Sequence, residues 1–179
     1  RKGGRGSCAA LLSEACGSLQ AMLEKQDRFE VASSGCTALI ALLAHGTLYV
    51  ANVGDSRAVL AHVSKANAQQ GPDREQLMVV PLTTDQVPGI KEERERIEEM
   101  GGSVRRDEST LTGEQGPFRV WRKDMQGPGL AMARSLGDTI AHEIGVSHRP
   151  TIREYRVSET DRMLLLATDG VWDMLDNAE

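Results

Sequence analysis

The chain has 179 residues, of which 40% are hydrophobic and 26% are charged, and its formal net charge at pH 7 is −5. This composition predicts one globular domain and excludes collagen-like, mucin-like and wholly disordered chains. The negative charge argues against nucleic acid as a partner, which would require a basic face, and no apolar run is long enough for a membrane span. The odd set of cysteines, Cys8, Cys16 and Cys36, favours free thiols in the reducing cytoplasm or nucleus.

The spacing of apolar residues predicts a mixed α+β chain. A helix is expected over residues 7–26, with Ser7 as its cap. Its predicted buried stripe recurs at three- and four-residue steps and consists of Leu11, Leu12, Ala15, Leu19, Met22 and Leu23. Further helices are expected over residues 90–100, just after 138 and over 169–175. Strands are expected over residues 38–44, 47–53, 57–63, 77–82, 152–157 and 163–168.

Three stretches have more specific expectations. Residues 38–44 and 47–53 are apolar on both alternating faces, which predicts a sheet that is covered on both sides. Residues 64–76 are polar and predict a surface loop. Residues 103–129 are rich in glycine and weakly periodic, so they predict either a functional flap or a disordered stretch.

The most informative segment for chemistry runs from Met163 to Asp173. A buried aliphatic strand is predicted to end at Asp169, and Asp173 follows four residues later on the same side of a helical turn. Two neighbouring carboxylates repel each other, and a hard cation such as Mg²⁺ or Mn²⁺ would relieve that repulsion. The alternative is structural: Asp169 caps a helix and Asp173 is a solvated side chain.

Two other segments place acidic residues at turns. Asp55 follows a predicted strand in the turn Gly54-Asp55-Ser56, where it is either a functional carboxylate or an ordinary turn residue. In residues 129–138, Arg134 could bind a phosphate and Asp138 a metal, although a structural turn explains Asp138 equally well.

Six segments form an ordered set of motifs along the chain. They are Ser34-Gly35-Cys36-Thr37-Ala38, the hairpin of residues 49–60, Leu82-Thr83-Thr84-Asp85, residues 92–104 with Arg96-Ile97 and Gly101-Gly102, residues 129–138, and residues 165–173. Together they resemble blocks of the metal-dependent protein phosphatase family, the protein phosphatase 2C type. The resemblance covers most of the chain, from about residue 33 to residue 173.

The resemblance implies a fold and a chemistry. The fold would be an α/β/β/α sandwich, with two central antiparallel sheets flanked by helices. The activity would be dephosphorylation of phosphoserine and phosphothreonine in protein substrates by a water activated at a dinuclear Mg²⁺ or Mn²⁺ centre. On matching positions, Asp169 would be the core metal ligand, Asp173 and Asp55 would belong to a weaker metal site, and residues 103–129 would form the flap beside the active site.

The sequence also departs from the family pattern. The Asp-Gly-His-Gly block does not occur in these 179 residues, and Asp176-Asn177 follows Asp169 too soon to be the family's closing Asp-Asn block, so a helix start is expected there instead. We therefore expect residues 1–179 to be a single partial domain that is inactive alone and exposes apolar sheet edges. Gln86 stands where the family usually has histidine, and Cys36 is expected to be a buried, inert thiol. The alternative function is a catalytically dead binding or regulatory module.

Overall fold

The computed structural model describes residues 7–64, 77–107, 116–124 and 126–177. Its helices are α1 (Cys8–Lys25), α2 (Lys91–Glu99), α3 (Thr139–His142) and α4 (Asp169–Trp172). Its longer strands are β2 (Ala38–Ala44), β3 (Thr47–Val53), β4 (Arg57–Val63), β5 (Leu77–Pro81), β10 (Thr151–Arg156) and β11 (Asp161–Ala167). The shorter strands are β1 (Gly35–Cys36), β6 (Gly102–Arg106), β7 (Phe118–Arg122), β8 (Pro128–Leu130) and β9 (Leu136–Gly137).

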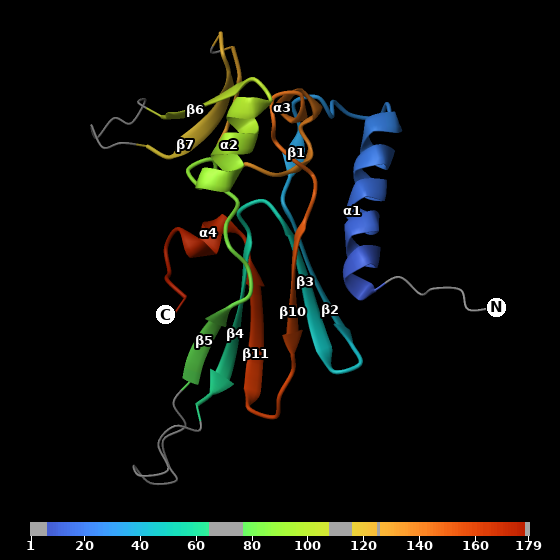
Figure 1. Cartoon of the computed structure of the whole chain (residues 1–179), viewed down its shortest axis with the longest axis vertical. Helices are drawn as coiled ribbons and strands as arrows, with labels where there is room; N and C mark the ends of the chain where they lie inside the picture. The colour runs from blue at the N-terminus through green and yellow to red at the C-terminus, as the bar shows by residue number, and fades with distance from the viewer. Residues whose placement is uncertain (1–6, 65–76, 108–115, 125, 178–179) are drawn as a thin grey trace, which may run out of the picture.

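Two three-stranded antiparallel sheets form the centre of the molecule, in the orders β10-β3-β2 and β11-β4-β5 (Figure 1). Their facing sides share one apolar core, in which Leu48 and Val50 of β3 meet Ala58 and Leu60 of β4. Helix α1 contacts β3 and β10 and so covers the other side of the first sheet. The predicted α+β class with two central antiparallel sheets is confirmed.

The hairpin between β2 and β3 has the bounds and the turn that the sequence predicts. His45 and Gly46 form its two-residue loop, and both have positive φ, at 50° and 73°. Two consecutive positive φ angles are the signature of the tight turn whose twist matches that of the flanking strands. The turn therefore fixes the register in which Ala44 faces Thr47.

Three burial predictions need correction. Strand β3 is largely buried, but β2 lies at the edge of its sheet and leaves Leu42 and Leu43 exposed, so the described residues do not cover it on both sides. Strand β11, which the sequence predicts to be buried, leaves Met163, Leu165 and Leu166 exposed. On α1, Leu12 of the expected stripe is buried as predicted, but Leu11, Leu19 and Met22 are exposed, and Cys16 and Gln20 complete the buried face.

Gln20 explains why the buried face of α1 is displaced from the apolar stripe. Its side-chain oxygen accepts a hydrogen bond of 2.8 Å from the backbone nitrogen of Gly137, and its nitrogen donates to the carbonyl of the same residue at 3.4 Å. A buried amide needs such partners. Ser7 caps the helix as predicted, accepting from the backbone nitrogen of Ala10 at 3.2 Å.

A separate core lies in the part of the molecule that contains α2, α3 and β6 to β8. Strands β6, β7 and β8 form a third antiparallel sheet, and α2 and α3 lie beside it (Figure 1). The buried centre contains Ile97, Val120, Ala133, Ala141 and Val146. The described part of residues 103–129 is thus built of strands, which their weak periodicity did not predict. The predicted loop at 64–76 lies almost wholly outside the described residues, and the flap role remains a prediction.

Two further observations concern the cysteines and membranes. Cys8, Cys16 and Cys36 are all free thiols, and Cys36 is exposed rather than buried as expected. Within the described ranges, no helix is both long enough and apolar enough to cross a membrane.

A buried ion cluster joins α2 to the segment that follows β8. The carboxylate of Glu93 pairs with Arg96 at 2.6 Å and accepts two hydrogen bonds from the Nε of Arg134, at 3.0 and 3.1 Å. Arg96 also donates to the carbonyls of Gly145 and Ala133. Burial alone would raise the pKa of Glu93, but the hydrogen bonds and charges of the two arginines outweigh it and lower that pKa.

We predict that Glu93→Gln destabilises the protein by about 3 kcal/mol at pH 7, because two half-buried guanidinium groups lose the buried carboxylate that they share. The stabilisation by Glu93 is present above the ordinary glutamate pKa and is lost as the pH falls through the lowered folded-state pKa. Urea unfolding at several pH values measures both effects. The matched control is Glu95→Gln on the same helix, where the exposed pair with Lys91 at 3.8 Å contributes about 0.5 kcal/mol or less. Equal losses in the two variants would contradict the prediction.

Candidate functional site

Asp55 lies in the turn between β3 and β4, and the turn geometry depends on the glycine before it. Gly54 has a φ of 106°, which side chains other than glycine rarely adopt. A Cβ at this position would lie 2.4 Å from Cγ2 of Thr37, so the close approach of the two segments also requires glycine. The sequence Gly54-Asp55 therefore places the carboxylate at the end of the central sheets.

Gln86 fixes this turn from the opposite side. Its side-chain oxygen accepts from the backbone nitrogen of Gly54 at 2.7 Å, and its side-chain nitrogen donates to the carbonyl of Asn52 and to Oγ1 of Thr151. Its backbone pairs with Gly54 as well, and its carbonyl accepts from Ala133 at 2.7 Å. One buried side chain thus connects the turn before Asp55 to β10 and to the segment after β8.

Asp169 and Asp173 reach the same end of the sheets along β11. This strand pairs with β4 so that Ala167 lies opposite Arg57, two residues after Asp55 along the chain. Asp169 begins α4, and the backbone nitrogen of Asp173 donates to the carbonyl of Asp169 at 2.7 Å, as predicted for one helical turn. The cap position belongs to Thr168, so the alternative that Asp169 is the cap is not met. Both carboxylates are exposed.

The electrostatics of Asp55 show that these carboxylates act on one another. Burial raises the pKa of Asp55, and the negative charges of Asp169, Asp85 and Asp173 raise it further, against a backbone hydrogen bond that lowers it. The charges of the two predicted residues Asp169 and Asp173 therefore act on the third, Asp55. The structure adds Asp85, to which the sequence pattern assigned no role.

Arg57 is a cation that lies beside this carboxylate group. It binds Asp85 through two hydrogen bonds, from Nε at 3.0 Å and from Nη2 at 2.7 Å, and donates to Oδ1 of Asn177 at 2.7 Å. Its guanidinium lies 5.2 Å from the ring centroid of Trp172. Arg57 therefore compensates Asp85 and holds the residues around Asp173. The segments containing Arg57 and Asp85 were recognised in the sequence, but only the fold shows that they pair.

The remaining sequence candidates have structural roles. Arg134, considered as a phosphate ligand, pairs with Glu93 and donates to the carbonyl of Arg149 at 2.8 Å. Asp138, considered as a metal ligand, is buried at the start of α3 with a φ of 42°, and its carboxylate packs over Gly35, where a Cβ would lie 2.0 Å from Oδ2. The turn interpretation of Asp138 agrees with this packing.

We refer to the end of the central sheets that carries Asp55, Asp85, Asp169 and Asp173 as the carboxylate edge. Its donor atoms suit a hard divalent cation. Asp55, Asp169 and Asp173 offer only oxygen atoms, which Mg²⁺ and Mn²⁺ prefer. Among the described residues, however, no group of three or more His, Cys, Asp and Glu side chains lies close enough together to hold a metal ion. The three aspartates are therefore an incomplete ligand set, and their role as metal ligands stays a prediction.

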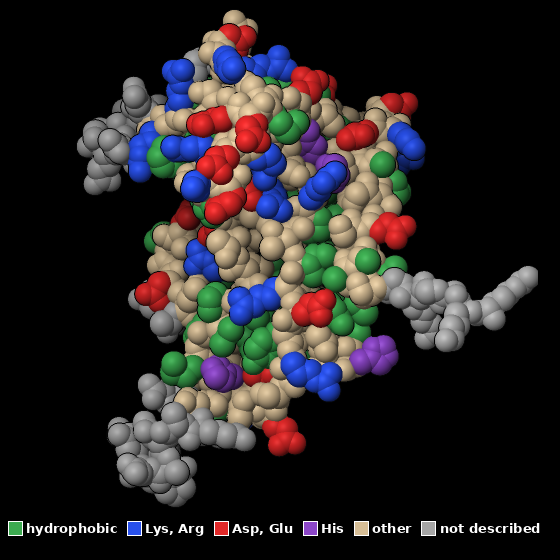
Figure 2. All heavy atoms as spheres, in the orientation of Figure 1, with side chains coloured by type: hydrophobic (Ala, Val, Ile, Leu, Met, Phe, Trp, Pro, Cys, Tyr) green, Lys and Arg blue, Asp and Glu red, His purple; other side chains and the backbone are tan. Residues whose placement is uncertain are grey.

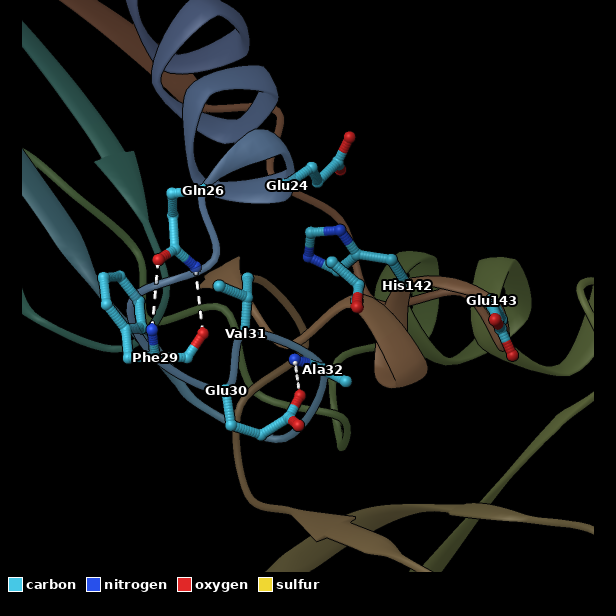
Figure 3. A pocket seen from close by; sticks show the side chains of 9 residues that line it. Glu24, Gln26, Phe29, Glu30, Val31, Ala32, His142 and Glu143 are labelled. Atoms are coloured by element: carbon cyan, nitrogen blue, oxygen red, sulfur yellow. Dashed lines mark hydrogen bonds between the residues drawn. The ribbon is translucent and has the colours of Figure 1, made fainter.

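Away from these carboxylates, a cavity of about 500 Å³ lies between the end of α1, the loop that follows it and α3 (Figure 3). Its acidic residues are engaged locally: Glu30 accepts from the backbone nitrogen of Ala32 at 2.7 Å, Glu24 accepts from Gln20, and Glu143 pairs with Arg122. Burial lowers the pKa of His142, and the charge of nearby His148 lowers it further. This cavity contains no pair of groups arranged for acid–base or nucleophilic chemistry.

Comparison with known proteins shows that the sequence of this chain matches one family. The sequence model of the family described as "Protein phosphatase 2C" matches residues 6–179. "Probable protein phosphatase 2C 48" of Oryza sativa subsp. japonica is 46% identical over 92% of this chain and 44% of that protein. "Probable protein phosphatase 2C 34" of Arabidopsis thaliana is 38% identical over 92% of this chain and 42% of that protein. The chain spans less than half the length of these relatives.

Solved structures show the same fold. A serine-threonine phosphatase 2C from Toxoplasma gondii matches with a TM-score of 0.66 and 25% identity, over 95% of this chain and 49% of that one. A sex-determining protein from C. elegans matches with a TM-score of 0.65 and 23% identity, over 97% of this chain and 37% of that one. The second likeness concerns the fold alone.

We predict that Asp55→Asn raises the melting temperature at pH 7 by a few degrees when divalent cations are absent. Because the folded-state pKa of Asp55 is raised, the folded protein loses stability relative to the unfolded chain as the pH rises through the interval above the ordinary aspartate value. Asparagine removes this loss, so the gain should vanish below about pH 4, where the aspartate is protonated in both states. Calorimetry across this pH range, with the exposed Asp27→Asn as control, measures the effect. A variant that is no more stable than the parent at pH 7 would refute it.

Proposed function

Because the chain belongs to the protein phosphatase 2C family, we propose that the full-length protein is a metal-dependent phosphatase. Its substrates would be proteins phosphorylated on serine or threonine, and its metal would be Mg²⁺ or Mn²⁺. The observation that carries the proposal is the group of carboxylates at one end of the central sheets, where the charges of Asp169 and Asp173 raise the pKa of half-buried Asp55. A perturbed carboxylate among other acidic groups is typical of functional sites.

The roles of these side chains follow from their positions. Asp169 stands at the end of β11, next to the start of β4, and is the residue we propose as the core metal ligand. Asp55 and Asp173 would contribute to a weaker adjoining metal site, with Gln86 fixing the turn before Asp55 and the charge of Arg57 acting on Asp173. When bound, Mg²⁺ or Mn²⁺ would supply Lewis-acid activation of the water that attacks phosphorus.

The incomplete set of metal ligands bears on whether these 179 residues are active alone. One carboxylate of the core site cannot hold two bridged ions. The Asp-Gly-His-Gly block, which the family uses for further ligands, does not occur in this sequence, and Asp176-Asn177 lies too close to Asp169 to be the closing Asp-Asn block. We therefore propose that the isolated chain is inactive and that activity belongs to the full-length protein, in the cytoplasm or nucleus.

The second candidate function is a catalytically dead module that binds phosphoproteins or regulates other enzymes. The absence of an assembled metal group within the described residues is the observation that favours it. The two candidates differ in the ligands that the full-length sequence supplies. An Asp-Gly-His-Gly block in that sequence favours the enzyme, and its absence favours the module.

We predict that the full-length protein hydrolyses a phosphothreonine peptide in the presence of Mn²⁺ and that Asp169→Asn lowers kcat by more than about 100-fold, because loss of a ligand exceeds the usual effect of losing an outer-shell partner. Addition of a chelator should abolish turnover equally. The 179-residue chain alone should show no Mn²⁺-dependent turnover.

The control for this measurement is Asp27→Asn, an exposed substitution of the same chemistry far along the chain from β11. It should leave turnover unchanged. If the isolated chain hydrolysed the peptide and Asp169→Asn abolished that turnover, the proposal that the isolated chain is inactive would be wrong. Full activity of Asp169→Asn in the full-length protein would overturn the assignment of that residue.

A further inference from the structure

Two arginines from different elements share one aromatic ring. Cζ of Arg94 on α2 lies 4.6 Å from the ring centroid of Phe118 on β7, and Cζ of Arg106 on β6 lies 4.3 Å from it. Arg106 stands directly opposite Phe118 in the ladder between β6 and β7. Both contacts are within the range of cation–π attraction, which holds a guanidinium against a ring without a carboxylate. We refer to these three residues as the arginine pair on Phe118.

The ring itself is held by a close approach to the segment before α2. A Cβ added to Gly89 would lie 2.8 Å from Cδ2 of Phe118, so the ring can occupy this place only because residue 89 is glycine. The arginine pair therefore sits on a fixed support that connects β7 to the segment of residues 82–90.

The arginine pair differs from Arg119 and Arg122 of β7 in its charge balance. Arg119 pairs with Asp107 at 2.8 Å, and Arg122 pairs with Glu143 at 3.0 Å. Among the described residues, no carboxylate forms an ion pair with Arg94 or Arg106. Arg106 donates to the carbonyl of Gly116 at 3.2 Å, and the Nε of Arg94 is buried without a hydrogen-bond partner there.

This imbalance is unusual for an acidic protein. The chain has a net charge of −5, and in the space-filling view red and blue side chains gather together over the half of the molecule that contains α2, β6 and β7 (Figure 2). Two guanidinium groups that form no ion pair with any described residue keep donors available for an outside anion. Because the ring occupies a face of each guanidinium, the N–H groups in its plane remain able to bind a carboxylate or a phosphate.

The arginine pair also lies near the carboxylate edge along the chain. Gly89 follows Asp85 by four residues, which a fully extended chain spans in at most about 14 Å, and the charge of Asp85 acts on Asp55. An extended peptide advances about 3.3 Å per residue. A substrate with its phosphorylated residue at the carboxylate edge can therefore reach the arginine pair with a side chain within about six residues of it.

We propose that Arg94 and Arg106 bind an anionic side chain of the phosphoprotein substrate, within about six residues of the phosphorylated one. The anion is either the carboxylate of an acidic residue or a second phosphate, since a guanidinium recognises both. This proposal rests on the proposed phosphatase function. It makes the arginine pair a determinant of substrate specificity rather than part of the reacting group.

The test uses the full-length protein and a set of phosphothreonine peptides. In each peptide one position among the six on either side of the phosphothreonine is glutamate, a non-hydrolysable phosphonate analogue of phosphoserine, alanine or lysine. We expect kcat/KM to be about five- to tenfold higher for an anion than for alanine at the favoured position, the size expected of two partly exposed ion pairs. An advantage for glutamate identifies a carboxylate site, and an advantage for the phosphonate alone identifies a phosphate site.

The variants separate the arginine pair from general charge effects. Arg94→Gln with Arg106→Gln should remove the preference, and Phe118→Leu should weaken it by releasing both guanidinium groups. The matched control is Arg105→Gln on β6, because successive side chains of a strand point to opposite faces. It should keep the preference. A preference that persists in the double variant, or that Arg105→Gln removes equally, overturns the proposal.

Two further readouts keep this proposal distinct from the proposed function. Turnover of p-nitrophenyl phosphate, which has no flanking residues, should be the same in the parent and in all these variants. If no form of the protein hydrolyses that compound with Mn²⁺, the phosphatase function has failed rather than the arginine site. Binding of the labelled peptides, followed by fluorescence anisotropy, then decides the arginine site alone: equal affinity for glutamate and lysine peptides overturns it.

Discussion

The buried amide of Gln86 is the contact on which the geometry of the carboxylate edge depends. Its side chain satisfies the backbone of the Gly54 turn and bonds to Thr151 of β10, and its backbone carbonyl accepts from Ala133 in the segment that follows β8. A neutral imidazole offers one donor and one acceptor, whereas this amide uses an acceptor and two donors at once. The turn before Asp55 is therefore held by a group that does not titrate.

Those carboxylates make the edge electrostatically unfavourable. Burial and three neighbouring negative charges disfavour the ionised form of Asp55. Arg57 compensates Asp85, yet among the described residues no lysine or arginine forms an ion pair with Asp55, Asp169 or Asp173. Elsewhere the same chain handles a buried carboxylate differently, because Glu93 is enclosed by Arg96 and Arg134 and its pKa is lowered. Within one chain, therefore, the pKa of one carboxyl group, Asp55, is raised and that of another, Glu93, is lowered.

The sequence predicted well those features that depend on local pattern. The bounds of β2, β3 and β4, the His45-Gly46 turn, the cap at Ser7 and the helical relation of Asp169 to Asp173 were all confirmed. Features that depend on a distant partner were missed. The buried face of α1 is shifted because Gln20 bonds to Gly137, 117 residues away. The sheet around Trp121 forms because Ser103 pairs with it across the chain, and no periodicity within residues 103–129 reveals that pairing.

The same distinction applies to the site and bears on whether the protein is an enzyme. Each aspartate could be found from its place after an apolar strand, but its coupling to the others required the register between β4 and β11. Once assembled, burial and the neighbouring charges disfavour the ionised form of Asp55, which makes no ion pair in return within the described residues. Natural proteins retain such locally unfavourable groups chiefly where function requires them. A module that only bound its partners would gain stability from asparagine at position 55. The retained charge of Asp55 therefore supports the proposed cation site over a surface that has lost its chemistry.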